Sequence, residues 1–166
     1  MSEPTAGSVR VWRLVKERHA DTAFDGEGAR LYGGRWNSIG HRVVYTSASL
    51  ALASLETLVH LDNARPLPRF IAFSVQIPPD DIASAAGRYS LPGQLPHLTE
   101  TRRIGDAWIN AGRHLALSVP SAIIPQEFNL LLNPAHPRFA QLVIGAPIGF
   151  AIDPRLRRQS EVTQKT

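Results

Sequence analysis

Short apolar segments broken by proline and glycine limit the possible folds of this chain more than any other feature. Thirteen of its 166 residues are proline, which lacks a backbone donor and is rare inside helices and central strands. Only two segments carry the apolar spacing of a helix, and the strand-like segments around them follow no regular alternation. This pattern favours a mixed α+β fold over a regularly alternating parallel sheet. The length suits one domain, which we expect to span residues 9–155, with flexible tails at 1–8 and 156–166.

The first expected helix begins after Ser47 or Ser49, either of which can cap it, and runs to about Leu61. The second covers 99–111, and Gly112 follows its last residue. Expected strands lie at residues 9–15, 42–46, 69–77, 115–119, 122–124, 142–144 and 148–152. The glycine-rich segment 21–37 is predicted to be a long loop, a kind of segment that often carries function.

The composition excludes several classes of protein. Cysteine is absent, so disulfides, thiolate metal ligands and thiol nucleophiles are excluded. No run of about 18 apolar residues is present that could span a membrane. Residues 1–9 also lack the basic-then-apolar order of a secretory signal. We therefore expect a cytoplasmic protein that does not enter a membrane.

The chain is basic, with a net charge of +4, and among its 18 basic residues only Lys16 and Lys165 are lysine. The planar guanidinium group of arginine binds phosphate and carboxylate groups through paired hydrogen bonds. The charge therefore fits nucleic acid, a phosphorylated small molecule or an acidic partner. Because the arginines are spread along the chain rather than clustered, a GC-rich genome that encodes arginine in place of lysine explains the composition equally well.

Common cofactor motifs are absent or incomplete. Segment 26–31 begins like a dinucleotide-binding fingerprint, but Leu31 stands where the third glycine belongs. We expect neither a strand before this segment nor a helix after it. No phosphate-binding P-loop and no nucleophile elbow occurs. The six histidines are well separated, so the sequence predicts no metal site.

Two stretches carry polar residues in unusual settings. The loop over 31–37 combines glycines, which let a ligand approach the backbone, with Tyr32, Arg35 and Trp36 for stacking and phosphate contact. It fits a surface loop anchored by Trp36 equally well. Glu56 lies at the edge of the apolar face of the first expected helix. A half-buried carboxylate needs a functional role or a partner, so Glu56 fits a catalytic group, an ion pair with one of the arginines, or a residue that is simply exposed.

A third stretch joins small hydroxyl residues to two amides. Segment 118–122 contains Ser118, Pro120 and Ser121, and Asn129 and Asn133 follow within a few residues. This arrangement fits the rigid wall of a polar pocket. Ordinary turn and capping chemistry explains each residue taken singly.

Taken together, these stretches resemble the RES domain, the toxin component of RES–Xre toxin–antitoxin pairs. The motifs lie in the order of the family between residues 9 and 155. They are Trp12-Arg13, Tyr32-Gly33-Gly34-Arg35-Trp36-Asn37, Val44-Tyr45-Thr46-Ser47, Leu55-Glu56-Thr57-Leu58-Val59-His60, Val119-Pro120-Ser121-Ala122-Ile123-Ile124-Pro125, Asn129, and Leu132-Asn133-Pro134 with His136-Pro137. Each motif is weakly specific by itself, whereas the ordered set is fairly specific. Segment 63–98 matches only loosely.

The resemblance implies an ADP-ribosyltransferase-like α+β fold, with two small, mostly antiparallel sheets around an NAD⁺ cleft and helices at its flanks. It implies an enzyme that consumes NAD⁺ by cleaving the nicotinamide–ribose bond and thereby arrests growth. The acceptor is water, inorganic phosphate or a protein side chain, and no metal is expected. It also implies inhibition by a cognate Xre antitoxin, a helix-turn-helix protein through which alone DNA is contacted, and a homo-oligomer of the toxin within that complex.

The functional residues of the family can be carried over by motif. Glu56 resembles the catalytic glutamate, and Tyr45 resembles the aromatic residue near nicotinamide. Arg13 resembles an arginine that holds an NAD⁺ phosphate, and Tyr32 and Arg35 fall in the loop that lines the cleft. The resemblance also implies catalytic or NAD⁺-binding positions at Ser121, Asn129 and Asn133, with His136 in the same C-terminal signature.

These assignments agree with the chemistry of the reaction. Cleavage of the glycosidic bond develops positive charge on the ribose, and a carboxylate at the ribose hydroxyls can stabilise that charge. Arginines suit the diphosphate, and an aromatic ring can stack on nicotinamide. Nicotinamide is already a good leaving group, so no strong general acid is required.

Two other functions remain open at this point. A nucleic-acid-binding module would use the arginines, but aromatic residues make up only 7% of the chain. The second expected helix also carries Glu100 and Asp106 beside Arg102 and Arg103, so it is not notably basic. A catalytically inactive domain that only binds its antitoxin would keep the fold and lose turnover.

Overall fold

The computed structural model describes residues 7–62, 65–86 and 97–156. Its strands are β1 (Val9–Lys16), β2 (Val44–Ser47), β3 (Phe70–Ile77), β4 (Ile82–Ser84), β5 (Ala116–Pro120), β6 (Phe128–Leu132), β7 (Val143–Ile144) and β8 (Ile148–Phe150). The α-helices are α1 (Glu27–Tyr32), α2 (Leu50–Leu58) and α3 (Leu98–Ala111). Short 3₁₀ helices lie at η1 (Glu17–Thr22), η2 (Pro79–Asp81), η3 (Phe139–Gln141) and η4 (Pro154–Leu156).

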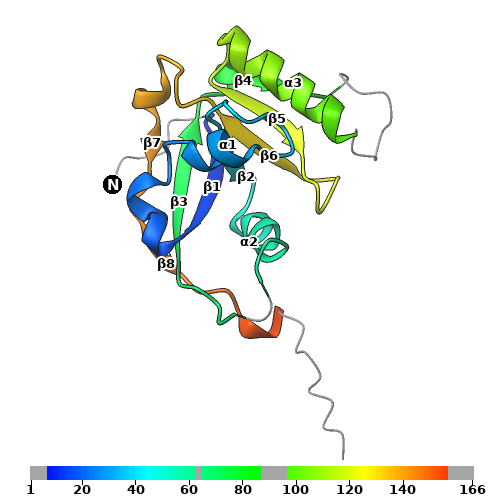
Figure 1. The fold of residues 1–166 in the computed structure, drawn as a ribbon. Helices are drawn as coiled ribbons and strands as arrows, with labels where there is room; N and C mark the ends of the chain where they lie inside the picture. The colour runs from blue at the N-terminus through cyan, green and yellow to red at the C-terminus, as the bar shows by residue number, and fades with distance from the viewer. Residues whose placement is uncertain (1–6, 63–64, 87–96, 157–166) are drawn as a thin grey trace, which may run out of the picture.

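The strands form one sheet in the order β4-β5-β6-β2-β1-β3-β7, and β8 also pairs with β3. Every pairing is antiparallel except that of β4 with β5. In Figure 1, β5 and β6 lie at an angle to β1 and β3, so β2 joins two differently oriented halves of the sheet. The expected α+β class is confirmed. Hydrogen bonding joins the strands into a single sheet, whereas we expected two.

Two helices cover the sheet near the junction of its halves (Figure 1). Helix α3 lies over β5 and β6, and its Ile104 and Trp108 are buried against Leu117 and Leu131. Helix α2 packs against β1, where its Ala53 is buried in a cluster with Leu14, Phe70 and Ala72. These apolar contacts fix where α2 and α3 stand above the sheet.

Side-chain alternation on β2 determines which residues face these helices. Val44 is buried in a cluster with Val11 and Leu130. Tyr45 instead packs against the cluster that holds Trp108 of α3. Because alternate residues of a strand point to the same face, Ser47 shares the α3 face with Tyr45.

Most of the expected elements are confirmed, with small shifts at their ends. Ser49 rather than Ser47 caps α2, because its side chain accepts a hydrogen bond from the Leu52 N–H. Helix α2 ends at Leu58 instead of near Leu61. Helix α3 covers the second expected helix, and Gly112 follows it in the left-handed conformation, with φ 59°. The expected 3-residue strand at 122–124 is wrong, because that segment turns around the Ser121 hydroxyl.

Segment 21–37 is not the structureless loop that we expected. It contains the end of η1 and the whole of α1, which coincides with the incomplete fingerprint over 26–31 instead of following it. Gly26 stands before α1 in the left-handed conformation, with φ 67°, and the Asp25 carboxylate accepts a hydrogen bond from the Glu27 N–H. The expected tails fall largely on residues 1–6 and 157–166, which lie outside the described residues. Within the described ranges, no helix is long and apolar enough to cross a membrane.

Candidate active site

Glu56 lies at the centre of a polar cluster above the sheet. It is half-buried in the last turn of α2. Its Oε1 atom accepts hydrogen bonds from the Ser121 hydroxyl and from the Asn129 side-chain amide, each at 2.7 Å. No partner of Oε2 is found in the described part of the chain. The carboxylate is therefore fixed through one oxygen and open at the other.

The Ser121 hydroxyl is oriented by its own surroundings. Ser121 is fully buried just after β5. Its Oγ accepts hydrogen bonds from the backbone N–H groups of Ile123 and Ile124, each at 3.0 Å. Because two donors occupy the lone pairs of the oxygen, its single O–H is left to point at Glu56. The same turn that makes 122–124 irregular thus supplies a fixed donor to the carboxylate.

Asn129 on β6 holds Glu56 from the sheet. A carboxylate only accepts hydrogen bonds, so the contact with Glu56 identifies the Asn129 nitrogen as the atom at Oε1. The other amide atom, Oδ1, is buried and has no hydrogen-bond partner among the described residues. Ser47 pairs with Asn129 across β2 and β6, is only 5% exposed, and shows no side-chain hydrogen bond within the described chain.

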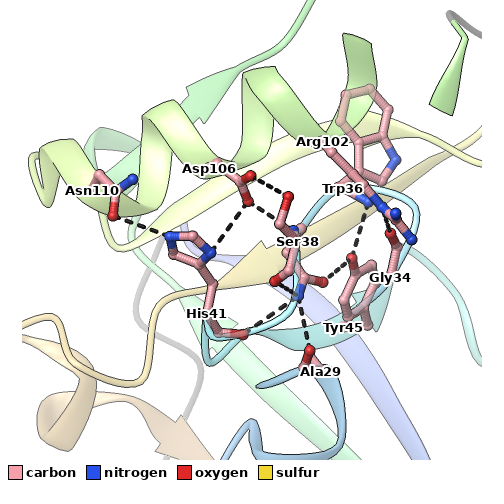
Figure 2. Close-up of polar contacts among 10 residues, drawn as sticks. Ala29, Gly34, Trp36, Ser38, His41, Tyr45, Arg102, Asp106 and Asn110 are labelled. Carbon is pink, nitrogen blue, oxygen red and sulfur yellow. Dashed lines mark hydrogen bonds and ion pairs between the residues drawn. The ribbon is translucent and has the colours of Figure 1, made fainter. Parts of the chain in front are cut away.

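Tyr45 is fixed through its hydroxyl, as Figure 2 shows. The hydroxyl donates to Asn37 Oδ1 at 2.7 Å and accepts from the Trp36 N–H at 3.2 Å. Burial raises the pKa of Tyr45 well above its ordinary value. A Cβ atom at Gly34 would lie 2.7 Å from Asn37 Oδ1, so this loop can close over Tyr45 only with glycine there. The ring of Tyr45, rather than its hydroxyl, is therefore the part that can meet a ligand.

The loop over residues 33–43 is bound to α3 by several hydrogen bonds (Figure 2). The Arg102 guanidinium donates to the Gly34 carbonyl at 2.9 Å. Asp106 accepts from the backbone N–H and the hydroxyl of Ser38, at 2.9 and 2.6 Å. Thr101 donates to the carbonyl of Arg35 at 2.5 Å. These bonds hold the loop against α3 and fix the backbone from which the Arg35 side chain extends.

Close backbone contact also holds the loop over residues 33–43 against α3. A Cβ atom at Gly105 would lie 2.8 Å from the carbonyl carbon of Trp36 and closer still to its oxygen. Real Cβ atoms do not approach backbone this closely. Glycine at this position of α3 therefore allows the loop to reach the helix.

Comparison with known proteins then identifies the family. Residues 10–153 match the family model of the RES domain. The chain belongs to the RES domain family. It is 38% identical over 151 residues to Toxin Res of Yersinia enterocolitica, and the match covers 89% of this chain and 99% of that protein. It is 36% identical over 159 residues to the Prs ADP-ribosylating toxin of a Sphingobium species, and the match covers 90% of this chain and 97% of that protein.

A solved structure shares the fold of this RES domain. The structure of the M. tuberculosis MbcT–MbcA toxin–antitoxin complex matches with a TM-score of 0.67 and 18% identity. The match covers 86% of this chain and 84% of that chain. At this level of identity the likeness concerns the fold alone.

The RES domain places Arg13 apart from Glu56. The Arg13 guanidinium donates to the backbone carbonyls of Ala23 and Tyr45, each at 3.0 Å. Burial lowers its pKa to about 10, although the nearby Asp25 carboxylate opposes that shift. Trp12 pairs with Ser47 and so shares its face, which leaves Arg13, one residue further, on the opposite face. The structure therefore gives Arg13 a role in bracing β2 rather than a place beside Glu56.

Two further predicted residues lie in a turn beyond β6. The Asn133 side chain accepts a hydrogen bond from the Ala135 N–H, and that of His136 accepts from the Arg138 N–H. Asn133 lies four residues after Asn129 along the chain, or about 13 Å at the rise of a strand. Both side chains shape this turn and do not reach the Glu56 cluster.

The loop residues Tyr32 and Arg35 are exposed. Tyr32 is 80% exposed at the end of α1. Arg35 makes no side-chain hydrogen bond or ion pair in the described residues, and its charge acts on Tyr45 together with that of Arg102. Arg35 is thus a free cation close to Tyr45.

Sequence reasoning missed two residues of this site. The sequence places Ser47 in the motif Val44-Tyr45-Thr46-Ser47 and offers it as a helix cap, but its pairing with Asn129 follows from strand register that the sequence does not show. Arg102 was read only as part of a helix of mixed charge, although it binds the Gly34 carbonyl. Among the described residues, no group of three or more histidine, aspartate and glutamate side chains could hold a metal ion.

Proposed function

We propose that this RES domain is the toxin of a toxin–antitoxin pair and that it consumes NAD⁺ by cleaving the nicotinamide–ribose bond. One observation carries the proposal: Ser121 and Asn129 fix the Glu56 carboxylate through Oε1, while Oε2 has no partner in the described part of the chain. A carboxylate held in this way suits the stabilisation of positive charge at a ribose. The name of one relative, the Prs ADP-ribosylating toxin, supports chemistry on NAD⁺, and the name Toxin Res supports the role of a toxin.

In the proposed reaction, the bond between C1′ of the ribose and the nicotinamide nitrogen breaks. The electron pair of that bond leaves with nicotinamide, which becomes neutral, and positive charge develops on the ribose. Oε2 of Glu56 stabilises this charge by accepting a hydrogen bond from a ribose hydroxyl. Water, phosphate or a protein side chain then attacks C1′ and loses its proton. The products are nicotinamide and the ADP-ribosylated acceptor.

The other residues of the site position the substrate in this proposal. The Tyr45 hydroxyl is bonded to the loop, so its ring stacks on nicotinamide. Arg35 has no partner in the described chain and binds the diphosphate. Arg13 acts indirectly, because its bond to the Tyr45 carbonyl braces the strand that carries the ring.

The partner and the location follow from the proposed activity. We place the protein in the cytoplasm, where NAD⁺ is abundant, under the control of an antitoxin of the Xre type. The fold likeness to a toxin from a toxin–antitoxin complex supports an antitoxin partner, and the Xre type is part of our proposal. Without an antitoxin, a free NAD⁺-consuming enzyme would harm its own cell.

Induced expression in bacteria tests this proposal. Glu127 is exposed and shows no side-chain bond in the described residues, so Glu127→Gln is a matched control for Glu56→Gln. The wild-type chain and Glu127→Gln should stop growth and lower cellular NAD⁺, whereas Glu56→Gln should do neither. Growth arrest with an unchanged NAD⁺ pool, or equal toxicity of Glu56→Gln, would contradict the proposal.

A further inference from the structure

An open cavity of about 540 Å³ lies at the start of α3, beside the loop that carries Arg35. Its lining includes Ser38, His97, Thr99, Arg102, Arg103 and Asp106. We call it the α3 cavity. None of these residues belongs to the Glu56 cluster, and none was assigned a function from the sequence.

The α3 cavity and the Glu56 cluster are both connected to Tyr45 through contacts of neighbouring residues. Arg102 lines the cavity and binds the Gly34 carbonyl, and Gly34 in turn touches the Tyr45 hydroxyl. The charges of Arg102 and Asp106 also act on the Tyr45 hydroxyl, where the first lowers its pKa and the second raises it. Tyr45 is also linked to the Glu56 cluster. Ser47 lies two residues after Tyr45 on the same face of β2, about 7 Å away, and it pairs with Asn129, which binds Glu56.

The charges of the cavity favour an anion. Arg103 is exposed and makes no hydrogen bond or ion pair with the described residues, and only one nitrogen of Arg102 is bonded, through Nε to Gly34. The one carboxylate, Asp106, is already bonded to Ser38 and lies 3.5 Å from the ring of His41. Guanidinium groups with free nitrogens bind phosphate oxygens in paired hydrogen bonds.

We propose that the α3 cavity binds the diphosphate-linked adenosine half of NAD⁺. This inference rests on the proposed function, which places the nicotinamide ribose at Glu56. A dinucleotide extends well beyond its nicotinamide ribose, so its second half must lie further along the same face. The α3 cavity has the volume of a typical small-molecule site, and Arg102 in its lining is linked through Gly34 to Tyr45. The domain thereby selects a dinucleotide over a simple nicotinamide riboside.

The first experiment compares an exposed arginine in the second turn of α3 with an exposed arginine just beyond the C-terminal end of that helix. Arg103 lines the cavity, whereas Arg113 follows the C-terminal end of the helix, so Arg113→Gln is the matched control for Arg103→Gln. The probe is ADP-ribose, which carries the adenosine diphosphate half of NAD⁺ and lacks the nicotinamide–ribose bond that the enzyme would cleave. Its dissociation constant is measured by calorimetry. We expect Arg103→Gln to weaken ADP-ribose binding by about 10- to 100-fold, as for a lost charged hydrogen bond. Arg113→Gln should stay within about twofold of wild type, as other distant surface changes do.

A second variant separates binding from folding. Thr99 is exposed in the first turn of α3, where an aspartate stabilises a helix by its interaction with the helix dipole. Thr99→Asp should therefore keep or raise the melting temperature, yet weaken ADP-ribose binding because it places negative charge in the cavity. It should also raise the KM for NAD⁺ while cleavage of nicotinamide riboside stays unchanged.

The outcomes distinguish this inference from the proposed function. If the wild-type chain cleaves NAD⁺ but Arg103→Gln and Thr99→Asp bind ADP-ribose as Arg113→Gln does, the α3 cavity is not the adenosine site and the proposed function stands. If folded wild-type chain neither cleaves NAD⁺ nor binds ADP-ribose, both fall. The inference is supported if ADP-ribose binds more weakly to Arg103→Gln and to Thr99→Asp but not to Arg113→Gln.

Discussion

Replacement of Ser121 by alanine tests whether the Glu56 carboxylate must be held in place. The substitution removes the 2.7 Å hydrogen bond to Glu56 Oε1 and the acceptor of the Ile123 and Ile124 N–H groups. A hydrogen bond to a charged group contributes about 1.5–3 kcal/mol. Ile123 is exposed and Glu56 is half-buried, so water replaces part of the loss. We therefore expect about 2 kcal/mol lower stability, which corresponds to a melting temperature about 4–8 °C lower in a domain of this size.

Activity should fall further than this change in stability explains. Asn129 still binds Oε1 in Ser121→Ala, so Glu56 keeps one of its two donors. Loss of a partner that orients a catalytic side chain should cost about 10- to 100-fold in activity, as it does for the partners of metal-binding side chains. We therefore expect kcat for NAD⁺ cleavage to fall by that factor with little change in KM. The assay is nicotinamide release at a temperature where the variant is fully folded.

Ser118→Ala provides the matched control, because Ser118 lies on β5, three residues before Ser121, and shows no side-chain bond in the described chain. It should retain wild-type activity. If Ser121→Ala cleaved NAD⁺ as fast as Ser118→Ala, Ser121 would have no part in positioning the carboxylate.

Three further changes test other parts of the account. Gly105→Ala should lower the free energy of unfolding by about 1–3 kcal/mol and reduce turnover, because the new Cβ pushes α3 away from the Trp36 carbonyl. Thermal unfolding measures the change in stability. Gly28→Ala is the control, because a Cβ at Gly28 meets nothing within 4 Å. Ser47→Ala should leave the melting temperature unchanged but raise the KM for NAD⁺, since the hydroxyl has no partner in the described protein; an unchanged KM would remove Ser47 from the site. Burial raises the pKa of Tyr45, so the folded protein keeps a proton that the unfolded chain releases, and stability should fall as the pH rises above about 10. Phenolate absorbance of folded wild type just above that pH should equal that of Tyr45→Phe, and a larger wild-type signal would refute the burial argument.

The sequence predicted the centre of the candidate site through motif order rather than through local pattern. Ser121 and Asn129 lie 65 and 73 residues from Glu56 along the chain. No periodicity spans such distances, so only the resemblance could bring the three residues together. The bond of each to the same carboxylate oxygen needed the structure.

Other features of the site depend on the face of the sheet or on contacts between distant segments, which the sequence does not show. Alternation showed that Trp12 and Arg13 point to opposite faces, but not that the site lies on the face of Trp12. Helix α1 was missed because its six residues are too few to show helical spacing. Gly105 was unremarkable in the sequence, since its need to be glycine comes from a backbone carbonyl in a distant loop.

The most direct test of the central claim is nicotinamide release from NAD⁺ by the purified chain, without antitoxin and with and without inorganic phosphate. We predict release by wild type and by Glu127→Gln, and a loss of at least about 10²-fold in Glu56→Gln, as for other preorganised groups that stabilise charge. A phosphate requirement would identify phosphate as the acceptor, and indifference to phosphate would favour water. Release by folded Glu56→Gln at the wild-type rate would contradict the account.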